Sequence, residues 1–490
     1  MIYPSLEEAK SIIANDDYGV IPISMELYSD IKTPIETLRI LKKVSSHVFI
    51  LESVDNSHRL GRYTFLGYDP KLELTCYNNK LKVNNQWDIN ETVKNPNEYI
   101  RKILKENKSP KIKGFPAFTG GLVGYFSYDY IKYSEPSLKL DCKEDEKFND
   151  VDLMLFDKVI VFDNYKQKII LIVNVKVTDF EVNYRKAEIE LKSMADLIRN
   201  GESVKDKKLS IKSEYKEYFS KEEYCNIVMK AKEYIKEGDI FQVVLSNRIE
   251  AEIEGSILDC YRVLRTTNPS PYMFYFYSND IEIAGASPET LVKLDNNKLY
   301  TFPLAGTRKR GKAEEEDKKL EKELLNDVKE LAEHNMLVDL GRNDIGKISE
   351  IGTVKVEKYM NIERFSHVMH IGSTVTGKIR EDRDALDTID AILPAGTLSG
   401  APKLRACEII NELERNKRGI YGGAIGYIDF TGNIDMCIAI RLAFSKHGKV
   451  FIRSGAGIVS DSIPENEYEE CKNKSKAVIN ALNISMEGID

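Results

Sequence analysis

Two pairs of glutamates with the same spacing, Glu330/Glu333 and Glu467/Glu470, are the residues that point most directly to chemistry. Residues three apart lie on one face of a helix, so each pair projects two carboxylates in one direction. Two such helices facing each other would gather four carboxylates, and a hard divalent cation would relieve their repulsion. Oxygen ligands with open water positions suit Mg²⁺, which proteins hold with a few carboxylates and an anionic substrate. Two solvated helix faces are the alternative that the spacing alone leaves open.

Three segments rich in small residues accompany these pairs. They are residues 302–311 with three cations, residues 394–402 with two hydroxyls, and residues 455–457 with two glycines. The last segment follows a predicted strand, 450–453, and precedes the helix that carries Glu467. Glycines let backbone N–H groups approach an anion, and a helix N-terminus adds a favourable dipole. Because Arg441, on a predicted strand at 436–444, can offer a carboxylate a bidentate fork, the sequence predicts a pocket for a small polyanion beside a metal.

The composition predicts a soluble cytosolic protein of the size of an enzyme. A chain of 490 residues with 42 % hydrophobic residues is long enough for sizeable cores. Its longest apolar stretch, 169–175, is too short to cross a membrane, and its first residues lack the pattern of a signal peptide. The net charge of −7 argues against a nucleic-acid partner. The seven cysteines are dispersed and form no C-x-x-C pair, which indicates reduced thiols.

Strand-like runs dominate the first part of the chain, whereas helices and strands alternate in the second. In the first part, strands are predicted at 48–51, 72–75, 159–162 and 169–173, and a helix at 181–199. Residues 201–220 are polar and lysine-rich, which is typical of a linker. Beyond them, a helix is predicted at 222–236, strands at 241–247, 273–277 and 281–286, and a long acidic helix from about residue 313. The pattern indicates an α/β or α+β catalytic region preceded by a strand-rich domain.

Residues 306–312 fit a nucleotide-binding motif, G-x-x-x-x-G-K, but the context does not. A P-loop needs Ser or Thr after the lysine to hold Mg²⁺, and Ala313 occupies that position. The acidic run that follows, 314–317, would repel a triphosphate. The sequence therefore disfavours a P-loop NTPase.

Eight segments closely resemble motifs of the chorismate-utilising enzymes, and among these the anthranilate synthase component I group. The segments are FQVVLS (241–246), ASPETL (286–291), PLAGTRKRG (303–311), ELAEHNMLVDLGRNDIG (330–346), FSHVMH (365–370), LPAGTLSGAPK (393–403), YGGAIGY (421–427) and RSGAGIV (453–459). The match is dense over 221–480, and LES (51–53) and GYFSYD (124–129) extend it to nearly the whole chain. The resemblance implies a layered α/β sandwich of β-sheets flanked by helices, with the catalytic site between layers.

The resemblance also implies an organisation and a reaction. It implies a tryptophan-binding N-terminal domain at 1–205, a linker at 206–220 and a chorismate-binding catalytic domain at 221–490. The expected activity is that of a cytoplasmic, Mg²⁺-dependent lyase that converts chorismate and ammonia to anthranilate and pyruvate, the first step of tryptophan biosynthesis. No cysteine has the glycine-flanked setting of a glutaminase nucleophile. A separate glutamine amidotransferase subunit is therefore implied as the source of ammonia.

Metal ligands follow from the same resemblance. Mg²⁺ is expected on the ring carboxylate of chorismate, with Glu333 and Glu470 as principal ligands. Glu330 and Glu467 are expected beside them, directly or through water. The metal would make C2 of the ring electrophilic for attack by ammonia.

Two residues are expected to move protons. Glu289 resembles the general acid that protonates the departing C4 hydroxyl, so its pKa should be raised by burial and by neighbouring anions. His370 resembles the acid–base residue of pyruvate elimination and aromatisation, with a core histidine as the alternative. The resemblance implies that Tyr421 and Arg441 bind the enolpyruvyl carboxylate. It implies that the ring side is bound by Gly306, Thr307, Thr397, Gly455, Ala456 and Gly457. Thr397 is also expected among the catalytic residues.

Two positions help to separate relatives that share this pocket. Isochorismate- and salicylate-forming members carry a lysine where this chain has Gln242, which cannot activate water. Aminodeoxychorismate synthases usually carry a lysine where this chain has Ala305, so direct addition of ammonia is favoured. Because some of those enzymes lack that lysine, aminodeoxychorismate synthase component I of the folate pathway stays the alternative. A non-catalytic tryptophan or chorismate sensor is an alternative of another class, and the complete set of acid, base and metal residues argues against it.

Two further segments, 51–53 and 268–273, resemble tryptophan-binding elements, one from each domain. Glu52 and Ser53 would hold the ammonium group of the amino acid, while Pro271, Tyr272 and Met273 would form an apolar slot for the indole. A ligand that bridges two domains can inhibit by favouring one arrangement of them. The alternative is that both segments only hold the domain interface together.

Overall fold

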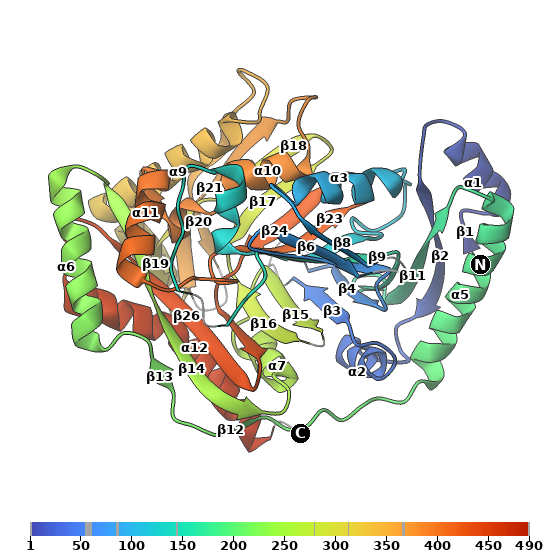
Figure 1. The fold of residues 1–490 in the computed structure, drawn as a ribbon, viewed down its shortest axis with the longest axis horizontal. Coiled ribbons are helices and arrows are strands. Elements are labelled where there is room, and N and C mark those ends of the chain that lie inside the picture. Colours follow the sequence, from blue (N-terminus) through green and yellow to red (C-terminus); the bar gives the residue numbers. More distant parts are fainter. Residues whose placement is uncertain are drawn as a thin grey trace.

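Two large antiparallel sheets form the centre of the protein (Figure 1). The structure is a computed structural model, and it describes residues 2–53, 61–84, 88–143, 146–278, 280–311, 313–364 and 368–488. The first sheet runs in the order β1 (Ile2–Tyr3), β2 (Val20–Tyr28), β11 (Lys168–Lys176), β10 (Lys158–Asp163), β4 (Tyr63–Tyr68), β3 (Val48–Glu52), β15 (Tyr272–Tyr277), β16 (Ile281–Ser287), β25 (Leu442–Lys446), β26 (Lys449–Ile458), β14 (Gln242–Glu254) and β12 (Ser210–Ile211). Two short strands, β13 (Lys216–Glu217) and β22 (Gly400–Ala401), also pair with β14.

The second sheet runs from β19 to β7. Its order is β19 (Leu304–Lys309), β21 (Val368–Lys378), β18 (Lys298–Thr301), β17 (Thr290–Asp295), β24 (Ile434–Ile438), β23 (Ala424–Asp429), β8 (Gly121–Phe126), β9 (Val151–Phe156), β5 (Leu72–Tyr77), β6 (Lys80–Asn84) and β7 (Ile89–Thr92). The strand β20 (Lys355–Arg364) pairs with β21. This layered mixture of sheets and helices confirms the predicted fold class.

Both sheets contain strands from both ends of the chain. In the first sheet β3 pairs with β15, and in the second β8 pairs with β23. The segment predicted as a linker, 206–220, carries β12 and β13, which pair with β14. The division into domains at 1–205 and 221–490 stays a prediction, because strand pairing alone does not say whether either part folds alone.

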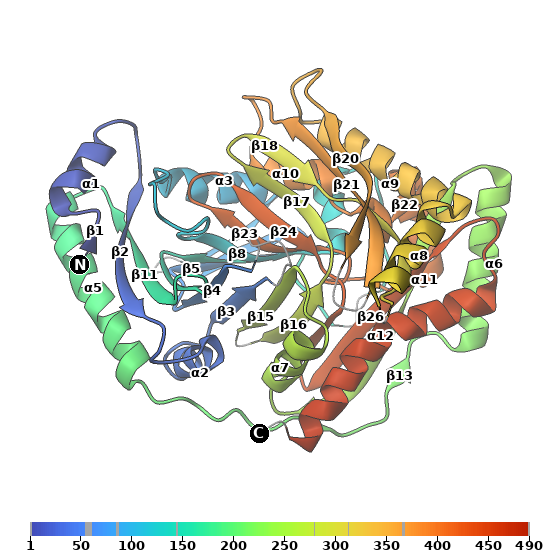
Figure 2. The same ribbon diagram turned by 180° about the vertical axis from the view of Figure 1, so that it is seen from behind.

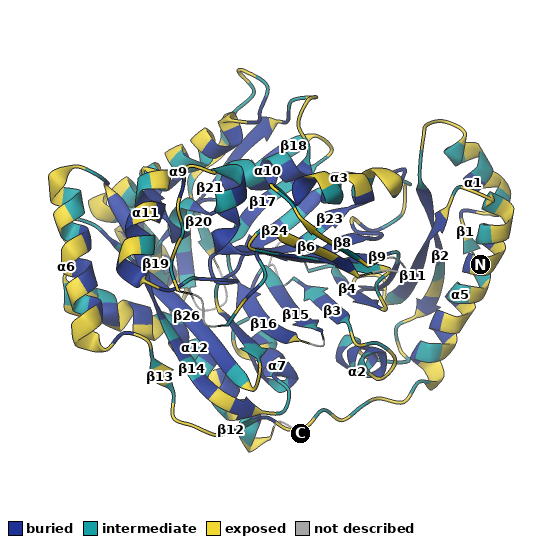
Figure 3. Ribbon diagram, in the orientation of Figure 1, coloured by how far each residue is buried: buried dark blue, intermediate teal, exposed yellow. Residues whose placement is uncertain are grey.

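Alternating side chains of β11 show how the layers are filled. Ile170 and Ile172 belong to the core between the two sheets, whereas Ile169 and Leu171 belong to the core on the outer face of the first sheet. Successive residues of a strand point to opposite faces, so a strand buried on both faces needs a continuous apolar run. Figure 3 shows this pattern as buried sheets beneath helices whose outward faces are exposed.

Helices cover the outer faces of both sheets (Figure 2). The helices on the first sheet are α2 (Pro34–Val44), α5 (Phe180–Asn200), α7 (Leu258–Thr267) and α12 (Pro464–Glu487), with α1 (Leu6–Ile13) beside β1, and α6 (Lys221–Glu237) and α11 (Lys403–Glu414) around β14 and β26. The helices near the second sheet are α3 (Asn97–Glu106), α4 (Ile131–Ser134), α8 (Glu314–Leu325), α9 (Val328–Gly346) and α10 (Ala385–Ile392), with the short 3₁₀ turns η1 (Tyr128–Tyr130) and η2 (Gly396–Leu398). None of the described helices has the length and apolar character needed to cross a membrane.

Most predicted elements are found, with longer bounds. The predicted strands at 48–51, 72–75, 159–162, 169–173, 241–247, 273–277, 281–286 and 450–453 correspond to β3, β5, β10, β11, β14, β15, β16 and β26, and the predicted helices at 181–199 and 222–236 to α5 and α6. The long helix predicted from about residue 313 is instead two helices, α8 and α9. They are separated because the Asp327 carboxylate caps α9, accepting from the backbone N–H groups of Lys329 at 3.1 Å and Glu330 at 3.2 Å.

The strand predicted at 436–444 is wrong. The chain leaves the second sheet at the end of β24, Ile438, and enters the first sheet at the start of β25, Leu442. Residues 439–441, which we call the crossover, connect the two sheets. Arg441 adopts a left-handed backbone conformation there, with φ of 53°. That conformation is uncommon for a residue other than glycine, and it turns the chain out of one sheet and into the other.

A close approach between strands of the second sheet generates a stability prediction. A Cβ atom at Gly124 would lie 2.0 Å from the backbone oxygen of Asp152 on β9, and neither backbone can move without breaking the sheet. We expect Gly124→Ala to lower the stability by at least about 1–3 kcal/mol, measured as a lower midpoint of thermal unfolding. Gly346→Ala is the control, since a Cβ there meets nothing within 4 Å. Equal midpoints for the two variants would contradict this reading of the sheet.

Candidate active site

Two connections between the sheets lie side by side. One is the crossover, which carries Arg441; the other joins β16 to β17 and carries Glu289. Hydrogen bonds tie them together: the Ile438 N–H donates to the Glu289 carbonyl at 3.0 Å, and the Ala286 N–H donates to the Arg441 carbonyl at 3.1 Å. The Ser287 hydroxyl donates to the Ile438 carbonyl at 2.7 Å. Two polar side chains are thereby held at the seam where the chain passes between sheets.

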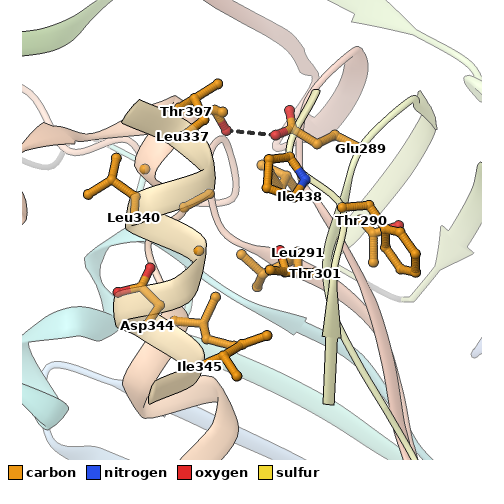
Figure 4. Close-up of a pocket in the computed structure, with 16 residues that line it drawn as sticks. Glu289, Thr290, Leu291, Thr301, Leu337, Leu340, Asp344, Ile345, Thr397 and Ile438 are labelled. Carbon is orange, nitrogen blue, oxygen red and sulfur yellow. Dashed lines mark hydrogen bonds between the residues drawn. The ribbon is translucent and has the colours of Figure 1, made fainter. Parts of the chain in front are cut away.

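Glu289 lies against a threonine from another part of the chain. The Thr397 hydroxyl, on η2, donates to the Glu289 carboxylate at 2.9 Å. Both residues close one end of a cavity of about 40 Å³ that runs along α9 past Leu337 and Leu340 (Figure 4). Burial raises the pKa of Glu289 to about 7, while the Thr397 hydroxyl and the Lys474 charge act to lower it. The predicted rise is confirmed; the expected contribution from neighbouring anions is wrong.

His370 faces a bulge in the neighbouring strand. On β21, its ring Nδ1 lies 2.7 Å from the Gly306 carbonyl and 3.2 Å from the Thr307 hydroxyl. The register between β19 and β21 shifts between Ala305 and Arg308, so Gly306 and Thr307 form the bulge opposite His370. This part of the small-residue segment 302–311 is therefore a bulged strand. A carbonyl acceptor fixes the Nδ1 proton, which makes Nε2 the acceptor of the neutral ring.

The electrostatics of His370 favour that neutral ring. Burial and the charge of Arg441 lower the His370 pKa, and the hydrogen bond to Gly306 opposes them. The charge of Arg441, on the crossover, therefore acts on the His370 ring. The first residues of the FSHVMH segment, 365–367, lie outside the described residues.

Arg441 and Tyr421 form the cationic side of the site. Arg441 is accessible to solvent, yet enough protein surrounds its guanidinium to lower its pKa, an effect that the neighbouring Tyr421 opposes. Tyr421 is buried, and burial raises its pKa far above the usual range for a phenol. Among the described residues no carboxylate forms an ion pair with Arg441, so its charge is available to an anionic ligand.

The glycine segment 455–457 is part of a strand and not a loop. Gly455, Ala456 and Gly457 continue β26 and pair with Ser246, Leu245 and Val244 of β14. The other edge of β26 pairs with β25 only up to Ile452, because β25 begins at the crossover. A Cβ at Gly457 would lie 2.7 Å from the Gln242 side-chain nitrogen. The glycine therefore lets the strand lie against Gln242 beside the site.

The four glutamates lie on the two helices that the spacing predicted, near one another but not gathered around a point. Burial and the charges of Glu330 and Glu470 raise the pKa of Glu333, and burial and the charge of Glu470 raise the pKa of Glu467. Glu330 pairs with Arg308 at 3.3 Å, and Glu470 with Lys474 at 2.8 Å. In the part of the chain that the structure describes, no three acidic, histidine or cysteine side chains lie close enough together to enclose a metal ion.

Lys474 is a site residue that the sequence reading missed. Its ammonium donates to the Gly455 carbonyl at 3.1 Å, and its charge lowers the pKa of both Glu289 and Glu333. Lys474 thereby interacts with Glu333, with the glycine segment 455–457 and with Glu289. The signal was available, because Lys474 lies four residues after Glu470 and therefore on the same helix face.

The two elements assigned to tryptophan lie together, because Glu52 on β3 is opposite Met273 on β15. The Glu52 carboxylate, however, accepts two hydrogen bonds from the Arg265 guanidinium, at 2.9 and 2.8 Å, and one from the Tyr261 hydroxyl at 2.5 Å. The Tyr272 hydroxyl donates to Asp435 at 2.7 Å. Within the described part of the chain, the buried Ser53 hydroxyl has no partner. Ser53 directly follows β3 and Pro271 directly precedes β15, so all five residues predicted for this site lie on or next to two paired strands.

Comparison with known proteins gives concordant results. A family model described as chorismate binding enzyme matches residues 46–480. An anthranilate synthase component 1 from Acetivibrio thermocellus is 47 % identical, covering 98 % of this chain and 99 % of that relative, and one from Aquifex aeolicus is 43 % identical, covering 99 % and 98 %. The crystal structure of anthranilate synthase component I from Streptococcus pneumoniae matches with a TM-score of 0.75 and 36 % identity over 92 % of this chain and 98 % of that one. The Escherichia coli isochorismate synthase MenF matches with a TM-score of 0.71 and 17 % identity over 97 % of this chain and 98 % of that one, a likeness of fold alone.

The contact between Thr397 and Glu289 generates a prediction about titration. A hydroxyl that donates to a carboxylate stabilises the charged form of that carboxylate. Thr397→Val should therefore raise the Glu289 pKa from about 7 by about one pH unit. Thr397→Ser keeps a hydroxyl and should leave it near 7. Infrared difference titration of the carboxyl bands measures the change, with the Glu289→Gln spectrum to assign the band. Identical midpoints in the valine and serine variants would contradict the assignment.

Proposed function

The chain belongs to the chorismate binding enzyme family, and from that premise we propose that it is the chorismate-converting subunit of an anthranilate synthase. The observation that carries the proposal is that Glu289 and Arg441 lie on two adjacent connections between the sheets, which backbone hydrogen bonds hold together. That arrangement sets an acid with a raised pKa and an accessible guanidinium at one seam, as a reaction on a dianionic substrate with a poor leaving group requires. The similarity to component 1 proteins over nearly the full length of both chains supports it.

Substrate binding is assigned to the cationic side and the glycine strand. Arg441 and Tyr421 hold the enolpyruvyl carboxylate, because a guanidinium fork and a phenol hydroxyl can both donate to it. Gly306 and Thr307, Thr397, and the backbone of residues 455–457 hold the ring side.

Proton transfer is assigned to Glu289 and His370. At neutral pH a carboxyl with a pKa of about 7 is protonated in a large fraction of molecules, so Glu289 can give its proton to the departing C4 hydroxyl. The Thr397 hydroxyl keeps the carboxyl oriented. His370, neutral and with its Nδ1 proton fixed by Gly306, offers Nε2 to a proton of the ring during aromatisation.

The glutamates fit a magnesium ion by their chemistry. They are oxygen donors on two helices, and the charges of Glu330 and Glu470 raise the pKa of Glu333, an effect that a divalent cation would relieve. We assign Glu333 and Glu470 as principal ligands with Glu330 and Glu467 beside them. When bound, Mg²⁺ would draw electron density from the ring carboxylate and make C2 electrophilic. Because no three described side chains enclose an ion, the substrate carboxylate and water are assigned the other positions.

Ammonia is assigned as the nucleophile. Gln242 is buried at the site and cannot act as a base, and the Ala305 methyl offers no nucleophile. We propose that a glutamine amidotransferase subunit supplies the ammonia, as the component 1 names of the relatives support. Tryptophan is the proposed effector, and the cytoplasm the proposed location. Aminodeoxychorismate synthase component I stays the alternative activity.

Removing a single carboxylate tests the metal assignment. We expect Glu333→Gln to lower turnover about a thousandfold, as the loss of several kcal/mol of charge stabilisation implies. The melting temperature should stay the same or rise, because Glu333 is destabilised by burial and by two like charges. Glu465→Gln, at an exposed position in the first turn of α12, is the matched control. Full activity of Glu333→Gln, or full activity in excess EDTA, would sink the assignment.

The product and nitrogen source test the reaction. The purified chain with chorismate, Mg²⁺ and ammonium should form fluorescent anthranilate, faster at higher pH where more ammonia is unprotonated. Glutamine should replace ammonium only after an amidotransferase subunit is added. Formation of 4-amino-4-deoxychorismate, identified by mass and by the absence of anthranilate fluorescence, would move the assignment to the alternative.

The Ser53 hydroxyl, which has no partner among the residues that the structure describes, tests the effector site. We expect millimolar tryptophan to inhibit the wild-type chain and to leave Ser53→Phe active, because a phenyl ring beside β15 would fill the proposed slot. Phenylalanine in place of tryptophan is the ligand control. A wild-type rate that ignores tryptophan would show that the two paired strands are structural.

A further inference from the structure

Three buried charged side chains form a cluster behind the active site. The buried charge cluster consists of Glu414 at the end of α11, Arg418 and Arg453, each with only 1 % of its side chain exposed. The Glu414 carboxylate accepts from Arg418 at 2.5 and 2.9 Å and from Arg453 at 3.0 Å. It also accepts from the backbone N–H and the hydroxyl of Ser246, at 2.7 and 2.9 Å.

Burying the cluster costs free energy, and its charges do not cancel. Two guanidiniums and one carboxylate leave a net positive charge in the interior. Even after relaxation, burying each ion costs several kcal/mol, and well-packed apolar side chains of similar volume are often equally stable. Stability alone therefore does not explain the cluster, and its contacts to the active site become the relevant feature.

Arg418 contacts three parts of the site from behind. Its guanidinium donates to the Leu398 carbonyl at 2.5 Å, directly after Thr397 on η2, and to the Val244 carbonyl of β14 at 2.7 Å. The guanidinium carbon lies 4.5 Å from the centre of the Tyr128 ring and 5.9 Å from that of Tyr421. One planar fork thus fixes a threonine turn, a strand and a phenol that come from separate parts of the sequence.

The other members of the cluster complete this support. Arg453 lies two residues before Gly455 on β26 and donates to the Ser246 hydroxyl at 2.8 Å and to the Lys417 carbonyl at 2.9 Å. Beyond η2, the Lys403 ammonium donates to the Asp344 carboxylate at 2.7 Å and to the Ile392 carbonyl at 2.8 Å. The turn that carries Thr397 is therefore held from both ends, and Arg418 holds the end nearer to Tyr421.

We propose that Arg418 is a positioning residue of the active site: through the Leu398 carbonyl it sets the Thr397 hydroxyl against Glu289, and through a cation–π contact of 5.9 Å it supports the Tyr421 ring. Glu414 orients Arg418 and compensates part of its charge. The inference rests on the proposed function for the roles of Glu289 and Tyr421. Arg418 itself touches neither the reacting atoms nor the substrate carboxylates.

The test replaces the fork and keeps its charge. In Arg418→Lys the ammonium cannot reach the Leu398 carbonyl, the Val244 carbonyl and Glu414 together. We expect the Glu289 titration midpoint, followed by infrared difference spectroscopy, to rise as it does in Thr397→Val. The Glu289 midpoint of the double variant, Arg418→Lys with Thr397→Val, should rise no further than that of either single variant, because both changes remove the same hydrogen bond. With chorismate and ammonium, kcat should fall about tenfold to a hundredfold, with a smaller change in KM, since Arg441 is not contacted by Arg418.

Two controls keep the outcome interpretable. Arg405→Lys changes a partly exposed arginine on α11 that pairs with Asp239, and it should leave the midpoint and the rate unchanged. If Arg418→Lys does not fold, the near-isosteric Glu414→Gln should move the Glu289 midpoint in the same direction by a smaller amount. A folded Arg418→Lys with a wild-type midpoint, or a double variant with additive shifts, would overturn the proposal. The titration needs no turnover, so it still decides the matter if the product is not anthranilate.

Discussion

The site depends on one topological constraint: the chain passes between the two sheets twice at adjacent positions. The connection from β16 to β17 carries Glu289, and the crossover from β24 to β25 carries Arg441. Because β16 pairs with β25 and β17 with β24, neither connection can move without disturbing both sheets. The backbone hydrogen bonds between them hold the two connections side by side. Everything else at the site is placed against this seam.

Burial at the site has opposite effects on the pKa values of its two titrating groups, Glu289 and His370. Burial raises the pKa of Glu289 to about 7 and lowers that of His370, since low polarity disfavours the charged form of each. The same environment therefore favours the protonated form of the carboxyl and the neutral form of the imidazole. That combination provides an acid and a base together, which the proposed reaction needs. Arg441 strengthens the effect, because its charge further lowers the pKa of His370.

The sequence predicted the local elements well and the connections poorly. Strands such as β11, with a continuous apolar run, and the two helices with paired glutamates follow from periodicity. The break at residues 439–441 has no such signal, because apolar residues continue through it and Arg441 takes a conformation usually marked by glycine. Likewise, Glu414 and Arg453 lie in contact although 39 residues separate them. Interactions between distant charges need the fold before they can be identified, and so the role of Arg418 emerges only from the structure.

The most direct test of this account is the pH dependence of anthranilate formation at a constant concentration of unprotonated ammonia. Holding that concentration fixed removes the effect of pH on the nucleophile, so the profile reports the protein. If Glu289 is the general acid, kcat/KM falls above about pH 7, as Glu289 loses its proton. The Glu289→Gln variant should be nearly inactive, and its remaining kcat/KM should not fall above pH 7. A rate that stays level from pH 6 to pH 9, or a Glu289→Gln variant with the wild-type profile, would contradict the account.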